Sequence, residues 1–75
     1  MQMLDILKSL SLKNIEGYGN LISYSDIFRA CKLQGQDNSE VIQLLLHQLE
    51  NQNVLAIVHM TDPGFEDLII GVTLS

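Results

Sequence analysis

The sequence predicts a small α+β domain, in which three helices are followed by a two-stranded antiparallel hairpin. Apolar residues recur at intervals of three and four over the first two-thirds of the chain, as in helices that bury one face. After Asn53 the period changes to two, which is typical of strands. A chain of 75 residues has room for one small core, so we expect a single domain over residues 1–75.

The first helix is predicted from about Gln2 to Leu12, with its apolar positions on one stripe: Met3, Ile6, Leu7 and Leu10. Residues 16–20 contain two glycines and are predicted as a loop, because glycine permits backbone angles that other residues resist. Residues 21–22 are predicted as a very short strand before the next helix.

The second helix is expected to begin after Ser23, an N-cap residue with Asp26 three positions on, and to end near Gly35. Its stripe consists of Tyr24, Ile27, Phe28 and Cys31. The third helix is predicted over Asn38–Asn53, with Asn38 or Ser39 as its cap. Its inward stripe is Ile42, Leu45, Leu46 and Leu49, which leaves Glu40, Leu44, His47 and Asn51 on the outer face.

The hairpin is predicted to join strands over residues 54–61 and 68–74 through a turn at Asp62-Pro63-Gly64. Opposing Met60 with Leu68 gives one face on which every member is apolar, and we expect this face to be buried. The other face then carries Leu55, Ile57 and Ile69 beside polar residues. Gly71 is expected opposite Ile57, where it leaves room for an inserted side chain.

The net charge of −5 is unevenly distributed. Every cation precedes residue 33, and from Leu33 to Ser75 the charged side chains are all acidic: Asp37, Glu40, Glu50, Asp62, Glu66 and Asp67. Non-specific binding of nucleic acid needs cations against phosphates, so the C-terminal half should repel it. The only cysteine is Cys31, and neither a secretory signal nor a transit peptide is visible, which indicates a cytoplasmic protein.

Two sets of residues are candidates for contacting a partner. Leu55, Ile57 and Ile69 on the predicted outer sheet face form either a protein interface or an ordinary set of strand-forming residues. Leu44 with His47, on the outer face of the third helix, is the second candidate, although one exposed leucine is common. The partner is expected to be another protein or a second copy of the chain.

The sequence offers almost no support for catalysis. It contains no phosphate-binding loop, hydrolase or zinc-binding pattern, so we predict no catalytic, cofactor-binding or metal-binding residue and no small-molecule substrate. Cys31 lies on an apolar stripe and is expected to be a buried, inert thiol. The longest wholly apolar runs are three residues, far below the ~20 needed to span a bilayer, so no membrane partner is expected.

The order of helix, short extended piece, helix, turn, helix and hairpin resembles the winged-helix variant of the helix-turn-helix superfamily over nearly the whole chain. The resemblance implies that DNA-binding members would use the third helix in the major groove and the hairpin, or wing, against the backbone. Here those positions are acidic or uncharged, and the only cations are Lys8, Lys13, Arg29 and Lys32. Many winged-helix domains act instead in protein interaction or dimerisation.

We therefore expect a non-enzymatic, acidic interaction or regulatory module, acting with another protein or as a homodimer. The alternative is a DNA-binding regulator that uses an atypical basic surface on the first two helices, formed by the four cations just named. Binding of nucleic acid through the third helix or the wing is not expected, because neither contains a cation.

Overall fold

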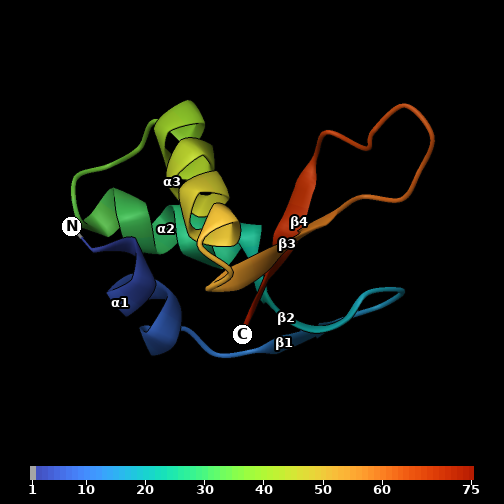
Figure 1. Cartoon of the computed structure of the whole chain (residues 1–75), viewed down its shortest axis with the longest axis horizontal. Coiled ribbons are helices and arrows are strands. Elements are labelled where there is room, and N and C mark those ends of the chain that lie inside the picture. Colours follow the sequence, from blue (N-terminus) through green and yellow to red (C-terminus); the bar gives the residue numbers. More distant parts are fainter. Residues whose placement is uncertain (1) are drawn as a thin grey trace.

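The computed structural model describes residues 2–75, which form three helices and a four-stranded antiparallel sheet (Figure 1). In chain order the elements are α1 (Met3–Ser9), β1 (Lys13–Ile15), β2 (Gly19–Ser23), α2 (Tyr24–Leu33), α3 (Ser39–Asn51), β3 (Leu55–His59) and β4 (Ile69–Leu74). The sheet order is β1-β2-β4-β3. The small α+β class is therefore as predicted, but the predicted order of three helices before one hairpin is wrong, because a β-hairpin lies between α1 and α2.

Side chains and turn residues set the ends of the two longer helices. The Ser23 hydroxyl accepts a hydrogen bond from the Asp26 amide at 3.3 Å, and Asn38 Oδ1 accepts from the Glu40 amide at 3.0 Å, which confirms both predicted caps. Gly35, at φ 89°, closes α2 as predicted, and Asn53, at φ 61°, closes α3 in the same way. In both cases the next amide bonds back to a carbonyl of the last turn.

Helix α1 is shorter than predicted. The backbone is already extended at Leu10 (φ −92°, ψ 146°), and the Ser9 hydroxyl donates to the Ile6 carbonyl at 2.7 Å. A serine that bonds to the helix backbone in this way competes with continued helical bonding, so the chain leaves the helix and enters β1. No helix within residues 2–75 is long and apolar enough to cross a bilayer.

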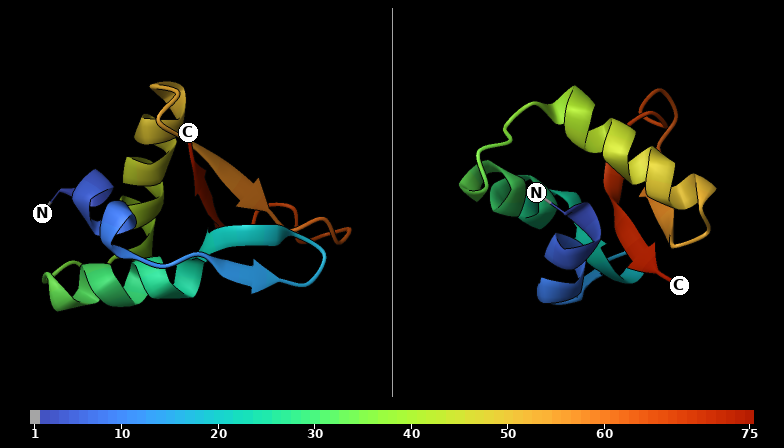
Figure 2. Two further views of the ribbon diagram at one scale, coloured as in Figure 1. Left: turned by 90° about the horizontal axis from the view of Figure 1, so that it is seen from below. Right: turned by 60° about the vertical axis from the view of Figure 1, so that its left-hand side comes forward.

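The core lies between the three helices and one face of the sheet (Figure 2). Each helix contributes the stripe that its periodicity predicts, with Leu7, Ile27, Cys31, Ile42 and Leu46 fully buried. Leu45 and Leu49 pack against this cluster. The predicted burial of the Cys31 thiol is thus confirmed, and this burial raises its pKa, because an apolar environment disfavours the thiolate.

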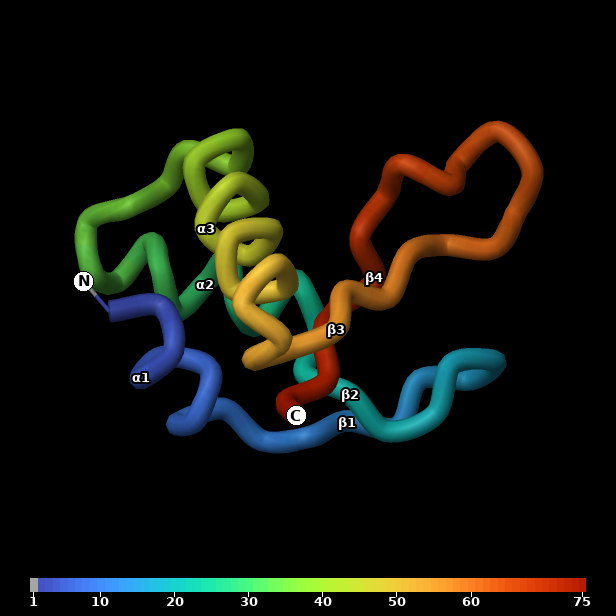
Figure 3. The backbone as a smooth tube through the Cα atoms, viewed as in Figure 1, coloured from blue at the N-terminus to red at the C-terminus, as the bar shows by residue number. Residues whose placement is uncertain are grey.

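The β1–β2 hairpin turns at residues 16–18, where the Tyr18 amide donates to the Ile15 carbonyl at 2.9 Å. Both hairpins project from the same side of the domain (Figure 3). The turn of the β1–β2 hairpin is tied to the start of the β3–β4 loop, since the Thr61 amide donates to the Tyr18 hydroxyl at 3.1 Å. The segment predicted as a loop with a two-residue strand therefore forms a second hairpin.

The β3–β4 pair contains a β-bulge that reverses the predicted faces of β3, whereas Val72 of β4 is buried as predicted. His59 lies opposite Ile69 and the Met60 amide donates to the Leu68 carbonyl at 2.9 Å, which is the predicted register. The bulge between Val58 and His59 then shifts the pairing by one residue, so that Ile57 lies opposite Val72 instead of Gly71. A shift of one residue moves every side chain to the other face of a strand.

The predicted outer sheet face is consequently part of the core. Leu55 and Ile57 are buried, with Ile57 only 9% exposed, and Ile69 packs against the same cluster. Ala56, which was expected to point inward, is exposed. The space beside Gly71 is also filled, because an added Cβ would collide with the Ile22 carbonyl oxygen and the Leu21 side chain.

Candidate interaction surface

The candidate site on the outer face of α3 lies at the surface, as predicted. Its inward residues, Ile42 and Leu46, are fully buried and fix the rotation of the helix about its axis. This rotation leaves Glu40, Leu44 and His47 exposed, and the Leu44 side chain is 58% exposed. Val41, also exposed, lies three positions before Leu44 and widens the apolar part of the face. We call Glu40, Val41, Leu44 and His47 the α3 face.

Two contacts attach the α3 face to the neighbouring strand. The His47 ring stacks on His59 of β3 with a centroid separation of 6.5 Å and an interplanar angle of 28°. One turn further along α3, Glu50 Oε2 accepts a hydrogen bond from the Ile57 amide at 2.9 Å. β3 lies at an edge of the sheet, so this carboxylate occupies an amide that a further strand would otherwise pair with. Helix α3 is thereby tied to β3 by two contacts, one of them made by the α3 face.

The three sheet residues predicted as a partner surface do not join the α3 face. Leu55, Ile57 and Ile69 point into the core or pack against it. Leu55 and Ile57 were wrongly predicted to point outward because the bulge lies between them and the hairpin loop. Ile69 lies on the loop side of the bulge, opposite His59, and packs against the core. Leu44 and His47 are thus the members of the predicted partner set that the structure leaves accessible.

The four cations do not form a free basic surface. Lys13 Nζ lies 2.8 Å from Asp26 Oδ2, and Arg29 Nη1 lies 3.7 Å from Asp26 Oδ1. The Asp26 side chain is only 12% exposed between them, so part of their field is cancelled by one carboxylate. Lys8, on α1, and Lys32, in the last turn of α2, are exposed. The ammonium of Lys13, followed by the Ser23 hydroxyl, holds the pKa of Asp26 below its ordinary value.

The lowered pKa of Asp26 predicts a loss of stability in acid. A carboxyl group whose folded pKa lies below its unfolded value contributes stability that is present above the unfolded value, 3.8, and is lost as pH falls through the folded pKa. Asp26→Asn should therefore be less stable than the wild type at neutral pH, and the difference should narrow below pH 3.8. Urea unfolding at a series of pH values measures this difference, with the exposed Asp5→Asn as the control. A gap that stays constant down to the lowest pH would contradict the assignment.

The loop between β3 and β4, residues 60–68, carries exposed acidic and apolar side chains. Glu66 Oε2 accepts from the Gly64 amide at 3.0 Å, which orders the tip. Phe65 and Leu68 are both more than half exposed. Residues 2–75 bring no three metal-ligating side chains together, and His47 and His59 have each other as ring neighbours.

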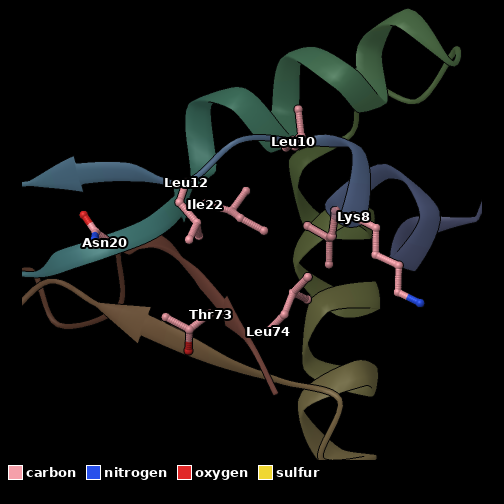
Figure 4. Close-up of a pocket in the computed structure, with 8 residues that line it drawn as sticks. Lys8, Leu10, Leu12, Asn20, Ile22, Thr73 and Leu74 are labelled. Atoms are coloured by element: carbon pink, nitrogen blue, oxygen red, sulfur yellow. The ribbon is translucent and has the colours of Figure 1, made fainter.

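A cleft that the sequence did not predict opens where β2 and β4 diverge (Figure 4). The two strands pair only at Ile22 with Val72 and at Ser23 with Gly71, and beyond these pairs β2 continues beside β1. The resulting cleft has a volume of about 360 Å³ and is lined by Leu7, Lys8, Leu10, Leu12, Asn20, Ile22, Thr73 and Leu74. It depends on strands that are far apart in the chain, so periodicity alone could not reveal it.

Comparisons of the chain with protein-family models, with curated proteins and with solved structures find no match.

Proposed function

We propose that this chain is a non-enzymatic interaction module of the winged-helix type, which binds a protein partner through the α3 face. The succession α1, β2, α2, α3, β3 and β4 supports the winged-helix class, with β1 as an addition that extends the sheet. The buried free thiol of Cys31 supports a place in the reducing cytoplasm, where a regulatory module of this kind would act.

The observation that carries the proposal is the exposure of Leu44 on a helix face that contains no cation. A leucine that is 58% exposed leaves apolar area in contact with water, which a partner could cover. The only fixed charge of the α3 face is that of Glu40, and no Lys or Arg occurs from Leu33 to Ser75. The face therefore suits a protein surface that combines an apolar group with Lys or Arg side chains.

The nucleic-acid alternative has less support. Phosphate contacts supply a large share of the affinity for DNA, and the α3 face would bring a carboxylate rather than a cation towards the backbone. Away from α3, Lys13 and Arg29 are already paired with Asp26. A DNA complex through Lys8, Lys13, Arg29 and Lys32 would have to compete with that carboxylate.

Site-specific photo-crosslinking tests the proposal and captures the partner in the same experiment. A photoreactive amino acid is placed at position 44, or at position 33 as the control, because Leu33 is 85% exposed but lies at the end of α2. We expect one protein to be captured in cells from position 44 and not from position 33. With that protein purified, Leu44→Ser should weaken binding about tenfold, as for a central contact, while Leu33→Ser should leave it unchanged.

Two results would count against the α3 face. One is equal capture from positions 44 and 33, which would indicate non-specific contact. The other is a purified complex whose affinity is the same for the wild type and for Leu44→Ser. Because Leu44 is exposed, its replacement by Ser should not affect folding, and thermal unfolding of both variants verifies this.

A further inference from the structure

The cleft between β2 and β4 concentrates exposed apolar surface beside Lys8. Leu12, 62% exposed, and the partly exposed Leu74 both line it, and its floor includes the buried Leu7 and Ile22. Its volume of about 360 Å³ lies within the range in which protein pockets bind drug-sized ligands, about 300–1,000 Å³. Lys8 is the only ionisable side chain in the lining.

The β3–β4 loop has the complementary composition. Phe65, 55% exposed, and Leu68 offer two large apolar side chains, separated by Glu66 and Asp67. Residues 60–68 contain no cation, and Asp62 adds a third carboxylate. An apolar cleft beside a lysine and an apolar loop rich in carboxylates match in both polarity and charge sign.

A single chain cannot bring these two surfaces together. The β3–β4 loop leads into the start of β4 (Figures 1 and 3). This strand begins at Ile69, and Leu74 at its other end lines the cleft. At about 3.3 Å per residue, the five steps from Ile69 to Leu74 hold the two sites about 17 Å apart. The loop can therefore reach a cleft only in another molecule.

We propose that the cleft binds the β3–β4 loop of a second copy of this chain, and that two copies exchange these loops about a twofold axis. Because loop and cleft lie at opposite ends of β4, two copies with antiparallel β4 strands place each loop beside the other's cleft. Phe65 and Leu68 enter among the leucines, and the loop carboxylates lie towards Lys8. None of the residues that the exchange joins belongs to the α3 face, so this inference is independent of the proposed function.

Sedimentation equilibrium over a wide range of concentrations tests the exchange. We expect the full chain to form dimers that weaken with added salt, since partly exposed charge pairs are screened. Leu12→Ser in the cleft and Phe65→Ser in the loop should each weaken dimerisation at least about tenfold. Leu33→Ser is the matched control and should have no effect, and neither should Leu44→Ser. All four positions are exposed, so each variant should fold, as its thermal unfolding will report.

Mixing the two defective variants gives the most specific result. A homodimer of either variant has both of its loop–cleft contacts impaired. Phe65→Ser impairs them at the two loops, and Leu12→Ser impairs them at the two clefts. In a mixed pair, the intact loop of Leu12→Ser meets the intact cleft of Phe65→Ser. The mixture should therefore dimerise more strongly than either variant alone. Lys8→Glu should likewise weaken dimerisation, and Asp67→Lys in the same chain should restore it.

Three outcomes would overturn the proposal. The chain could remain a monomer at every concentration, it could dimerise equally well with Leu12→Ser and Phe65→Ser, or it could form an open series of larger species, as a contact that does not close would. None of these outcomes bears on capture from position 44, so failure here is distinct from failure of the α3 face.

Discussion

Ile57→Glu is expected to unfold the domain. Ile57 is 9% exposed, lies opposite the fully buried Val72 and donates its amide to Glu50. A carboxylate at this position would lose most of its hydration, with a cost of several kcal/mol. A chain of 75 residues has a total stability of only roughly 4–11 kcal/mol, so this cost removes most of it.

Ala56→Glu is the matched control, because Ala56 is the neighbouring residue on the exposed face of the same strand. We expect it to change the free energy of unfolding by about 0.5 kcal/mol or less, as at ordinary surface sites. Far-UV circular dichroism and thermal unfolding distinguish the two variants. If Ala56→Glu unfolds the domain while Ile57→Glu remains folded, then β3 lies with its other face inward and the bulge is misplaced.

Gly71→Ala is expected to destabilise the domain by about 3 kcal/mol, at the upper end of the range for overpacked sites. The added Cβ would meet the carbonyl oxygen of Ile22 and the side chain of Leu21. The carbonyl belongs to the backbone of β2, where Ser23 lies opposite Gly71, so relief requires the two strands to separate. Urea unfolding measures this loss.

Gly17→Ala is the control for Gly71→Ala, because it separates the effect of a steric collision on stability from the effect of backbone conformation. Gly17 has a φ of 86°, where alanine is strained, but a Cβ there meets no atom within 4 Å. We expect a cost of about 1 kcal/mol, from the left-handed conformation alone. Gly71 has no such conformational demand. A smaller loss for Gly71→Ala than for Gly17→Ala would show that β2 and β4 are not in such close contact.

Helical structure could be predicted well because its determinants are local. The inward stripe of α3, the caps at Ser23 and Asn38 and the closing Gly35 depend on residues within one or two turns. The face of β3 could not be fixed in the same way. Both alternating sets on that strand are largely apolar, so either face suits a core, and a single bulged residue decides between them.

The β1–β2 hairpin was not predicted because β1 is only three residues long and shows no apolar alternation. Its place is secured by distant contacts, among them the bond between Lys13 and Asp26 and the bond between Tyr18 and Thr61. The α3 face likewise has features that the sequence predicts and features that depend on distant contacts. The exposure of Leu44 and His47 follows from helical period, whereas the stacking of His47 on His59 depends on how α3 crosses the sheet.

Amide chemical shifts offer the most direct test of the claim that the α3 face binds protein and not nucleic acid. The labelled chain is titrated at low ionic strength, once with the purified protein captured from position 44 and once with duplex DNA. The α3 face account predicts that the protein shifts the amides of Val41, Leu44 and His47, and that DNA shifts neither these nor the amides of Lys8, Lys13, Arg29 and Lys32. Saturable shifts on α3 or at these cations with DNA, and none on α3 with the protein, would contradict it.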